Sequence, residues 1–342
     1  MDNTAHISFN AEDRSYFAIL KKEIHNIATN AGFTAARTGE IDIIVAEIAS
    51  NLIKHAGGGE ILARIVPGDN DNVALELISI DSGPGMADPS KMMEDGMSTA
   101  NTLGQGFGAI KRLSDTFQVY SLKDWGTVVL ARVYKKELPH FTKKKPAAEI
   151  RSIVVAKPGE TVSGDGDYWN LGTNTLKIFL GDGLGHGPDA HLAVQKAIEA
   201  VKTCTSDVPS EILRYIHADV KKTRGLVGTA VVYNFKERVW RICGVGNIAT
   251  RMQQSMSVKN HMSYNGVLGM NVPNTLKEQD TVNERGQVLI LCSDGIKTRW
   301  DLVKHIGIMK YDLTILAAVI YKDFGRKTDD MSVIACRINA AS

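Results

Sequence analysis

The sequence predicts an α+β protein with two domains, and three observations lead to that prediction. Its 342 residues suit two domains of ordinary size. Segments with helical and with strand-like periodicity are mixed in both halves of the chain. Between the halves, residues 135–149 read KKELPHFTKKKPAAE, which is basic, contains two prolines and has no periodicity. We therefore expect a domain at 1–135, a linker at 136–149 and a second domain at 150–342.

Apolar periodicity places the individual elements in order along the chain. Helices are predicted where apolar residues recur every three or four positions, and strands where short apolar or alternating runs stop at Gly, Asn or Asp. In the first half these criteria predict helices at 11–30 and 38–56, strands at 60–66 and 73–80, a short helix at 109–114, and strands at 116–122 and 126–134. In the second half they predict strands at 151–156 and 175–181, helices at 188–203 and 208–223, strands at 227–235, 238–243 and 287–292, a helix at 312–322 and a strand at 331–338.

Composition argues against several classes of protein. Lys and Arg number 40 against 38 Asp and Glu, so charge gives no case for binding nucleic acid or a membrane surface. No apolar run approaches the roughly 20 residues of a membrane helix, and the N-terminal MDNTAHISFN lacks a secretory signal pattern. The four cysteines are widely spaced without a CxxC pair, which is typical of free thiols in a reducing compartment. We expect a cytoplasmic protein.

The predicted helix at 38–56 carries two polar residues one turn apart. Its apolar residues form a buried stripe at Ile41, Val45, Ile48, Leu52 and Ala56. Glu47 and Asn51 are four positions apart and therefore share a different face. A carboxylate and an amide so placed can organise a metal ion and a hydroxyl. Taken alone, the pair is more typical of a solvated polar face.

Two glycine-rich segments follow this helix. The run LELISIDSGPGM is an alternating strand that ends at Asp81, whose acceptor-only carboxylate suits the exocyclic amine of adenine. Gly83 and Gly85 lie in the turn that follows and permit close approach to the backbone. Residues 104–113, GQGFGAIKRL, place three alternating glycines at a helix start, where free N–H groups suit phosphate oxygens. Each motif alone is weak evidence, but their order indicates a nucleotide site.

With these motifs, residues 1–135 resemble the GHKL (Bergerat) ATPase family, in the short form found in bacterial anti-sigma-factor serine kinases such as RsbT. The resemblance implies an α/β sandwich, ATP and Mg²⁺ as cofactors, and a lid at 87–103. The implied roles are Glu47 as general base, Asn51 as Mg²⁺ ligand, Asp81 and Thr127 at adenine, Gly83 and Gly85 in the pocket wall, and Gly104, Gly106 and Gly108 at phosphate. His55 is interpreted as structural. Phe107 stands where the family often has a smaller aliphatic residue, a change of packing.

Acidic residues of the second half stand where apolar alternation stops, at a predicted sheet edge or in a loop. The positions are Asp165 or Asp167, Asp182, Asp294, and Asp329 with Asp330. Asp-Gly pairs are common in turns, so any single one is more typical of a hairpin or a surface acid. Four such positions gathered at sheet ends would form an oxygen-lined site for Mg²⁺ or Mn²⁺. Two such ions roughly 3.5–4 Å apart can polarise a phosphate and activate water without a protein nucleophile.

The elements SGD, GDGLGHG, SDG and DDMSV occur in the order found in metal-dependent phosphatases of the PPM superfamily. Residues 150–342 resemble its SpoIIE and RsbX members, which implies an α-β-β-α sandwich and two Mn²⁺ or Mg²⁺ ions. The implied ligands are Asp182, the catalytic bridge between the ions, with Asp165 and the Gly183 carbonyl at the first ion and Asp294 with Asp329 or Asp330 at the second. His186 is interpreted as structural rather than catalytic. No phosphate-binding arginine is evident near the start of this domain.

Two complete motif sets in one chain predict a bifunctional switch. One domain would phosphorylate Ser or Thr of a partner protein and the other would remove phosphate. The resemblance implies a STAS-domain partner, with a sigma factor or response regulator as a further candidate and a homodimer left open. In the alternative, the first domain is an ATP-dependent adaptor or anti-sigma module beside an active phosphatase. A third reading leaves only the phosphatase active. Glu47 favours the kinase, because an adaptor needs no base.

Overall fold

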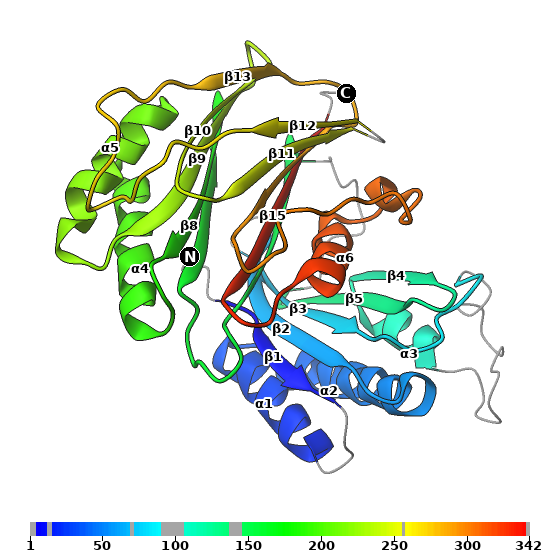
Figure 1. Cartoon of the computed structure of the whole chain (residues 1–342). Coiled ribbons are helices and arrows are strands. Elements are labelled where there is room, and N and C mark those ends of the chain that lie inside the picture. The colour runs from blue at the N-terminus through cyan, green and yellow to red at the C-terminus, as the bar shows by residue number, and fades with distance from the viewer. Residues whose placement is uncertain are drawn as a thin grey trace. The chain divides into compact units, whose positions relative to one another are not determined.

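The chain divides into two compact units, Met1–Lys143 and Lys144–Ser342. The computed structural model describes residues 5–11, 16–68, 72–89, 106–136, 146–254 and 257–339. The N-terminal unit contains one sheet and the C-terminal unit contains two (Figure 1). Buried apolar residues form one core in the first unit and two in the second. Within the described ranges, no helix has both the length and the apolar character needed to cross a membrane.

In the N-terminal unit, the described strands form a five-stranded antiparallel sheet with helices packed on one face, in agreement with the predicted α/β sandwich. The strand order is β1-β2-β3-β5-β4. Apolar side chains of the three helices meet those of β2, β3 and β5 in one core. The elements are β1 (Ile7–Asn10), α1 (Tyr16–Asn30), α2 (Ala35–Asn51), a π-helix (Leu52–Ala56), β2 (Glu60–Pro67), β3 (Val73–Ile80), α3 (Gly106–Leu113), β4 (Thr116–Leu122) and β5 (Gly126–Tyr134).

Helix α2 is the element that presents the predicted Glu47 and Asn51. It begins after Thr34, whose side-chain oxygen accepts a hydrogen bond from the Arg37 N–H and so caps the first turn. The predicted single helix differs at its C-terminal end, because Leu52–Ala56 form a π-helix. π-Helical turns are rare and occur frequently at functional sites. The wider turn begins directly after Asn51.

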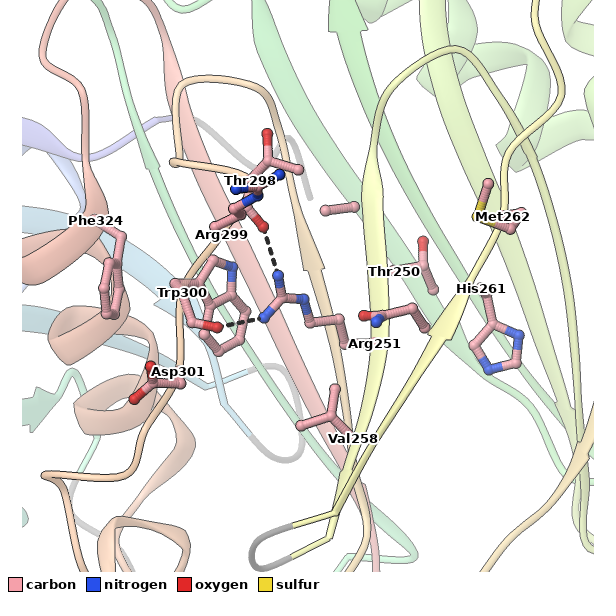
Figure 2. Close-up of a pocket in the computed structure, with 12 residues that line it drawn as sticks. Thr250, Arg251, Val258, His261, Met262, Thr298, Arg299, Trp300, Asp301 and Phe324 are labelled. Atoms are coloured by element: carbon pink, nitrogen blue, oxygen red, sulfur yellow. Dashed lines mark hydrogen bonds between the residues drawn. The ribbon is translucent and has the colours of Figure 1, made fainter.

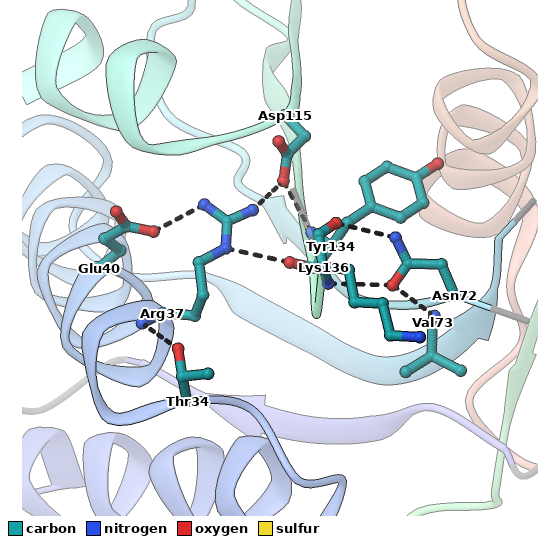
Figure 3. Close-up of polar contacts among 8 residues, drawn as sticks. All are labelled: Thr34, Arg37, Glu40, Asn72, Val73, Asp115, Tyr134 and Lys136. Carbon is teal, nitrogen blue, oxygen red and sulfur yellow. Dashed lines mark hydrogen bonds and ion pairs between the residues drawn. The ribbon is translucent and has the colours of Figure 1, made fainter. Parts of the chain in front are cut away.

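A polar network fixes α2 to the end of β5 (Figure 3). Arg37 donates from Nε to the Tyr134 carbonyl at 3.0 Å and pairs through Nη2 with Asp115. The Asp115 carboxylate also accepts the Tyr134 N–H at 2.7 Å. Asn72 bridges in the same way, since its side chain bonds both the N–H and the carbonyl of Lys136 at 3.0 and 2.8 Å. The bonds to Tyr134 and Lys136 satisfy backbone groups where the sheet ladder stops, and the two interactions made by Arg37 set the position of α2 against the sheet.

A buried ion group crosses the centre of the N-terminal sheet. Glu76 on β3 lies directly opposite Arg64 on β2 and Arg132 on β5. The Arg132 Nε atom is 2.5 Å from a Glu76 carboxylate oxygen, and His6 Nε2 is 3.5 Å from the other. Burial alone would raise the pKa of Glu76, but Arg132, with His6 and Arg64, outweighs burial and holds that pKa well below its usual 4.5.

Replacing Glu76 with Gln is expected to lower the free energy of unfolding of the N-terminal unit by about 3–5 kcal/mol, because two buried guanidinium groups lose their counter-charge. Because the folded-state pKa of Glu76 is lowered, its stabilisation is present above pH 4.5 and is lost as the pH falls below that value. Hydrogen exchange of the β3 and β5 amides measures both effects. Glu23→Gln on the exposed face of α1 is the matched control. Equal protection in the two variants would contradict the prediction.

The C-terminal unit is an α-β-β-α sandwich, which confirms the predicted fold class. Its two antiparallel sheets have the orders β13-β10-β9-β8-β7 and β12-β11-β14-β15-β6. One core joins the facing sides of the two sheets, and a second joins α4 and α5 to the outer side of the first sheet. The elements are β6 (Ala148–Val155), β7 (Asp165–Leu171), β8 (Thr175–Gly183), α4 (Pro188–Thr203), α5 (Pro209–Asp219), β9 (Leu226–Asn234), β10 (Val239–Val245), β11 (Ala249–Gln254), β12 (Ser257–His261), β13 (Gln279–Val282), β14 (Val288–Cys292), α6 (Leu313–Phe324) and β15 (Met331–Ile338).

Five strands were not predicted from the sequence, and all lack a clear apolar signal. They are β1, β7, β11, β12 and β13. Four of them, all but β11, are edge strands of their sheets. An edge strand is solvated on one side, so its residues need not be apolar. Such a segment becomes a strand because it pairs with its neighbour, which a local pattern does not reveal.

Candidate functional sites

The first candidate site lies in the N-terminal unit, where α2 meets the start of α3. A Cβ atom at Gly106 would stand 3.3 Å from both Glu47 Oε2 and Asn51 Oδ1. Glu47 and Asn51 are therefore on the same side of α2, as their spacing predicts, and the N-terminus of α3 faces them. Gly106 leaves open the space that a side chain would fill. Backbone N–H groups at a helix start favour anions, so a phosphate would fit here.

The predicted adenine-reading residues meet across neighbouring strands. Asp81 follows β3, and its Oδ1 atom accepts N–H bonds from Gly83 at 2.9 Å and Thr127 at 3.1 Å. The Asp81 N–H donates in turn to the Thr127 carbonyl at 3.0 Å. Two bonds to Oδ1 thus fix the orientation of this half-buried carboxylate, and the backbone bond holds Asp81 against Thr127.

Ser121 on β4 supports this corner and was missed by sequence reasoning. Its hydroxyl donates to the Gly126 carbonyl at 2.8 Å, accepts the Met86 N–H at 2.8 Å and lies 3.0 Å from Thr127 Oγ1. A serine in a strand carries no local signal of such a role. The pairing of Ser121 with Thr127 across β4 and β5 is what creates it.

The glycines of the turn after Asp81 are required by close packing. A Cβ at Gly83 would stand 2.7 Å from Ala56 Cα. At Gly85, φ is +65° and a Cβ would stand 1.9 Å from the Leu122 carbonyl oxygen. Gly108 is buried within α3. The predicted phosphate glycine Gly104 and residues 90–103 of the predicted lid lie outside the described residues.

The second candidate site lies in the C-terminal unit, where strand ends bring acidic residues together. Asp165 opens β7 and stands directly opposite Asp182, near the end of β8, in the antiparallel register. Asp167, the alternative candidate to Asp165, stands opposite Leu180 and accepts a hydrogen bond from the Ser152 hydroxyl. In the second sheet, Asp294 follows β14 and Asp330 precedes β15, which are hydrogen-bonded neighbours.

Five carboxylates interact electrostatically at this site and are here called the acid cluster. Burial, followed by the charges of Asp165, Asp294, Asp329 and Asp330, raises the pKa of Asp182 to about 10. Burial likewise raises the pKa of Asp165 to about 7, with Asp330 and Asp294 adding to the rise and the hydroxyls of Ser293 and Ser332 opposing it. Such a cluster is destabilised when its members are ionised and no cation is present.

The chemistry of this acid cluster fits a divalent cation. One carboxylate oxygen of Asp165, Oδ2, is buried and has no hydrogen-bond partner, a cost that a cation would relieve. Within the described part of the chain, no three His, Cys, Asp or Glu side chains already stand at metal-ligand spacing. The acids therefore share one electrostatic environment without forming a closed cage. Oxygen donors of this kind suit Mg²⁺ or Mn²⁺.

The two acids before β15 have different surroundings. Asp330 is buried, and its Oδ1 atom accepts the Lys157 N–H at 2.9 Å. Asp329 is partly exposed and accepts the N–H of Asp330. Both raise the pKa of Asp182. Either could therefore contribute an oxygen to a cation in this cluster.

Residues missed by sequence reasoning surround the acids. Asn247, just after β10, donates from Nδ2 to Asp294 at 3.0 Å. Glu160 lies 2.6 Å from His186 Nδ1, so a carboxylate orients the histidine that leads into α4. His191 on α4 donates from Nδ1 to the Ser163 carbonyl at 2.8 Å, next to the turn that carries Asp165. These contacts join segments far apart in sequence, and no local pattern signals them.

An open pocket of about 700 Å³ lies beside β11 and β12 in the same unit (Figure 2). Arg251 lies over the Trp300 ring at 4.0 Å and donates to the carbonyls of Trp300 and Thr298 at 2.8 and 2.6 Å. The stacked guanidinium fixes the loop that continues from Asp294. None of the predicted site residues lines this pocket.

Comparison with known proteins identifies both units. Residues 9–133 match the model of the histidine kinase-like ATPase domain, and residues 172–339 match that of stage II sporulation protein E (SpoIIE). The serine/threonine-protein kinase RsbT of Bacillus subtilis (strain 168) is 38% identical over 106 residues, which are 31% of this chain and 79% of RsbT. The phosphoserine phosphatase RsbX of the same strain is 23% identical over 151 residues, which are 44% of this chain and 75% of RsbX.

Solved structures agree with the fold. A chain from a study of the bacterial stressosome as a modular system adapted to control secondary messenger signalling is 26% identical, with a TM-score of 0.52 over 56% of this chain and 100% of its own. RsbX in complex with magnesium has a TM-score of 0.51 at 20% identity, over 58% of this chain and 98% of its own, and so supports the fold. The chain therefore belongs to the RsbT-like family of histidine kinase-like ATPase domains, joined in one polypeptide to a PPM phosphatase domain of the SpoIIE type.

Proposed function

We propose that this protein is a bifunctional signalling switch that phosphorylates Ser or Thr of a regulatory partner with its N-terminal unit and removes such phosphate with its C-terminal unit. The observation that carries the proposal is the presence of both residue groups in one chain: Glu47 and Asn51 at Gly106, and the acid cluster around Asp182. The phosphatase half has support from the SpoIIE-type match and from RsbX. The kinase half has support from RsbT.

In the phosphatase unit, the proposed metal-holding groups are Asp165, Asp182, the Gly183 carbonyl, Asp294 and Asp329 or Asp330. Two Mn²⁺ or Mg²⁺ ions, when bound, would polarise the phosphate ester and lower the pKa of water. The protein's own contribution is to hold the carboxylates in place. The strand register sets Asp165 against Asp182, Asn247 orients Asp294, and the Lys157 N–H orients Asp330.

In the kinase unit, ATP with Mg²⁺ would supply the phosphoryl group, with Asn51 as the proposed Mg²⁺ ligand. Asp81, held by the N–H groups of Gly83 and Thr127, would accept the adenine amine. Glu47, one turn before Asn51, would take the proton of the acceptor hydroxyl. Because phosphoryl transfer depends mainly on positioning and charge neutralisation, these few groups suffice.

The two activities would oppose each other on a single acceptor residue and would then only consume ATP. Therefore, either a signal favours one of the two units, or the two units act on different partner proteins. A STAS-domain regulator of sigma-factor or stress signalling is the proposed phospho-partner, because the two halves are similar to RsbT and RsbX.

The test incubates the full chain with Mg²⁺-ATP and purified STAS-domain proteins, then with the phosphorylated proteins and Mn²⁺. Mass spectrometry follows the gain and loss of phosphate on Ser and Thr. The proposal expects transfer in the first reaction and release in the second. Absence of both reactions with every STAS protein tried would refute it.

A further inference from the structure

Arg224 lies beside the loop that follows Asp182, although it is 42 residues downstream of Asp182 in the sequence. Strands β8 and β9 pair so that Gly183 faces Leu226. The pairing continues past the strand ends, because the Leu184 N–H donates to the Gly225 carbonyl at 3.1 Å. The antiparallel register therefore sets Arg224 opposite Gly185, three residues beyond Asp182.

The Arg224 guanidinium packs directly on this loop. Its Nη1 atom is 3.0 Å from the point where a Cβ at Gly185 would stand. Gly185 has φ +82°, so the absence of a side chain serves both the turn and the close approach of the arginine. The guanidinium thus stands over the segment between Asp182 and His186.

Arg224 is only loosely held by protein groups. Its Nη2 atom is 3.4 Å from Asp189, and the two side chains are 50% and 70% exposed. An ion pair so exposed contributes little stability. The donors of Arg224 are therefore accessible to a ligand at the rim of the acid cluster.

A phosphate monoester that approaches this site carries two negative charges toward five carboxylates. Metal ions in the cluster would offset part of that repulsion, but a cation at the rim would also attract the non-bridging oxygens. A guanidinium is well suited to this, since it presents paired donors that match two phosphate oxygens.

We propose that Arg224 is a substrate-binding residue of the phosphatase unit, which pairs with the phosphate group of the phosphorylated Ser or Thr. This inference rests on the proposed phosphatase function. Arg224 would then provide the phosphate-binding arginine that is not evident near the start of the domain.

The test is steady-state kinetics of the full chain with Mn²⁺, using a phosphoserine peptide and para-nitrophenyl phosphate as substrates and inorganic phosphate as competitive inhibitor. Arg224→Ala is expected to raise KM for both substrates and Ki for phosphate about 10-fold or more, with kcat within about 3-fold, because a charge-assisted bond to the bound group is lost. KM and Ki of Arg224→Lys should lie between those of Arg224→Ala and those of the wild type, because lysine keeps the charge without the paired donors.

Two control variants separate phosphate binding from a structural role. Arg285→Ala removes an exposed arginine at the opposite end of β14 from Asp294 and should match the wild type. Asp189→Asn breaks the exposed ion pair but keeps Arg224, and should also match the wild type.

Three outcomes would overturn the inference while leaving the phosphatase function in place. Unchanged KM and Ki in Arg224→Ala, with an active wild type, would show that Arg224 does not contact phosphate. A rise in KM and Ki in Asp189→Asn equal to that in Arg224→Ala would mean that Arg224 acts only through the ion pair. A rise in KM for the peptide alone would place Arg224 at the peptide chain rather than at phosphate. A wild type inactive with both substrates would instead contradict the phosphatase function itself, and this inference with it.

Discussion

Replacing Asp182 with Asn is expected to lower the phosphatase kcat of the full chain on the order of 1,000-fold, because the cluster loses the carboxylate that interacts electrostatically with all four other acids. Asp182 is the acid whose pKa is raised by each of the other four acids, so a cation held by them would interact with its carboxylate. Hydrolysis of para-nitrophenyl phosphate at saturating Mn²⁺ measures the loss.

The fold should survive this substitution. Asn has nearly the same shape as Asp, and it removes a carboxylate whose ionisation is opposed by burial and by its neighbours. The melting temperature without added metal should therefore be unchanged or higher. Added Mn²⁺ should raise the melting temperature of the wild type but not that of Asp182→Asn, because a ligand stabilises only a state that binds it.

The matched control is Asp280→Asn on β13, since Asp280 is an exposed acid of the same sheet. It should keep wild-type kcat and the Mn²⁺-dependent rise in melting temperature. Full activity in Asp182→Asn would show that the acid cluster is not the catalytic centre.

Replacing Glu47 with Gln is expected to lower the rate of phosphate transfer to the partner about 100- to 10,000-fold, the range typical for loss of a general base. Affinity for Mg²⁺-ATP should change little, because Asn51, Asp81 and the start of α3 are untouched. Single-turnover transfer from labelled ATP measures the rate, and calorimetry measures the affinity. Glu23→Gln on the exposed face of α1 is the control and should match the wild type in both.

This pair of measurements also decides between the kinase and the adaptor. If the wild type transfers no phosphate, and Glu47→Gln still binds ATP and still controls its partner, the N-terminal unit is a nucleotide-dependent binding module. If Glu47→Gln transfers phosphate at the wild-type rate, the base lies elsewhere. Loss of ATP binding in Glu47→Gln would contradict the separate roles of Glu47 and Asn51.

Local periodicity was sufficient to predict features whose cause lies within one element. The helical spacing of the apolar stripe on α2 determines that Glu47 and Asn51 share another face, and the structure has them together at Gly106. The abrupt end of apolar strands at Asp81, Asp182 and Asp294 likewise placed these acids at sheet ends. The π-helix after Asn51 was not predicted, because no local pattern distinguishes LIKHA from an ordinary helix end.

Contacts between distant segments were decided by the tertiary structure alone. The sequence by itself determined the two-domain α+β architecture, the candidate acids and the glycine-rich motifs, because these depend on spacing within a segment. Only the folded chain decided that Asp165 rather than Asp167 faces Asp182, that Asn247 bonds Asp294, and that Arg224 packs on Gly185. The physical reason is register: strand pairing brings residues together according to hydrogen bonds between strands, and one residue of slip would change every such neighbour.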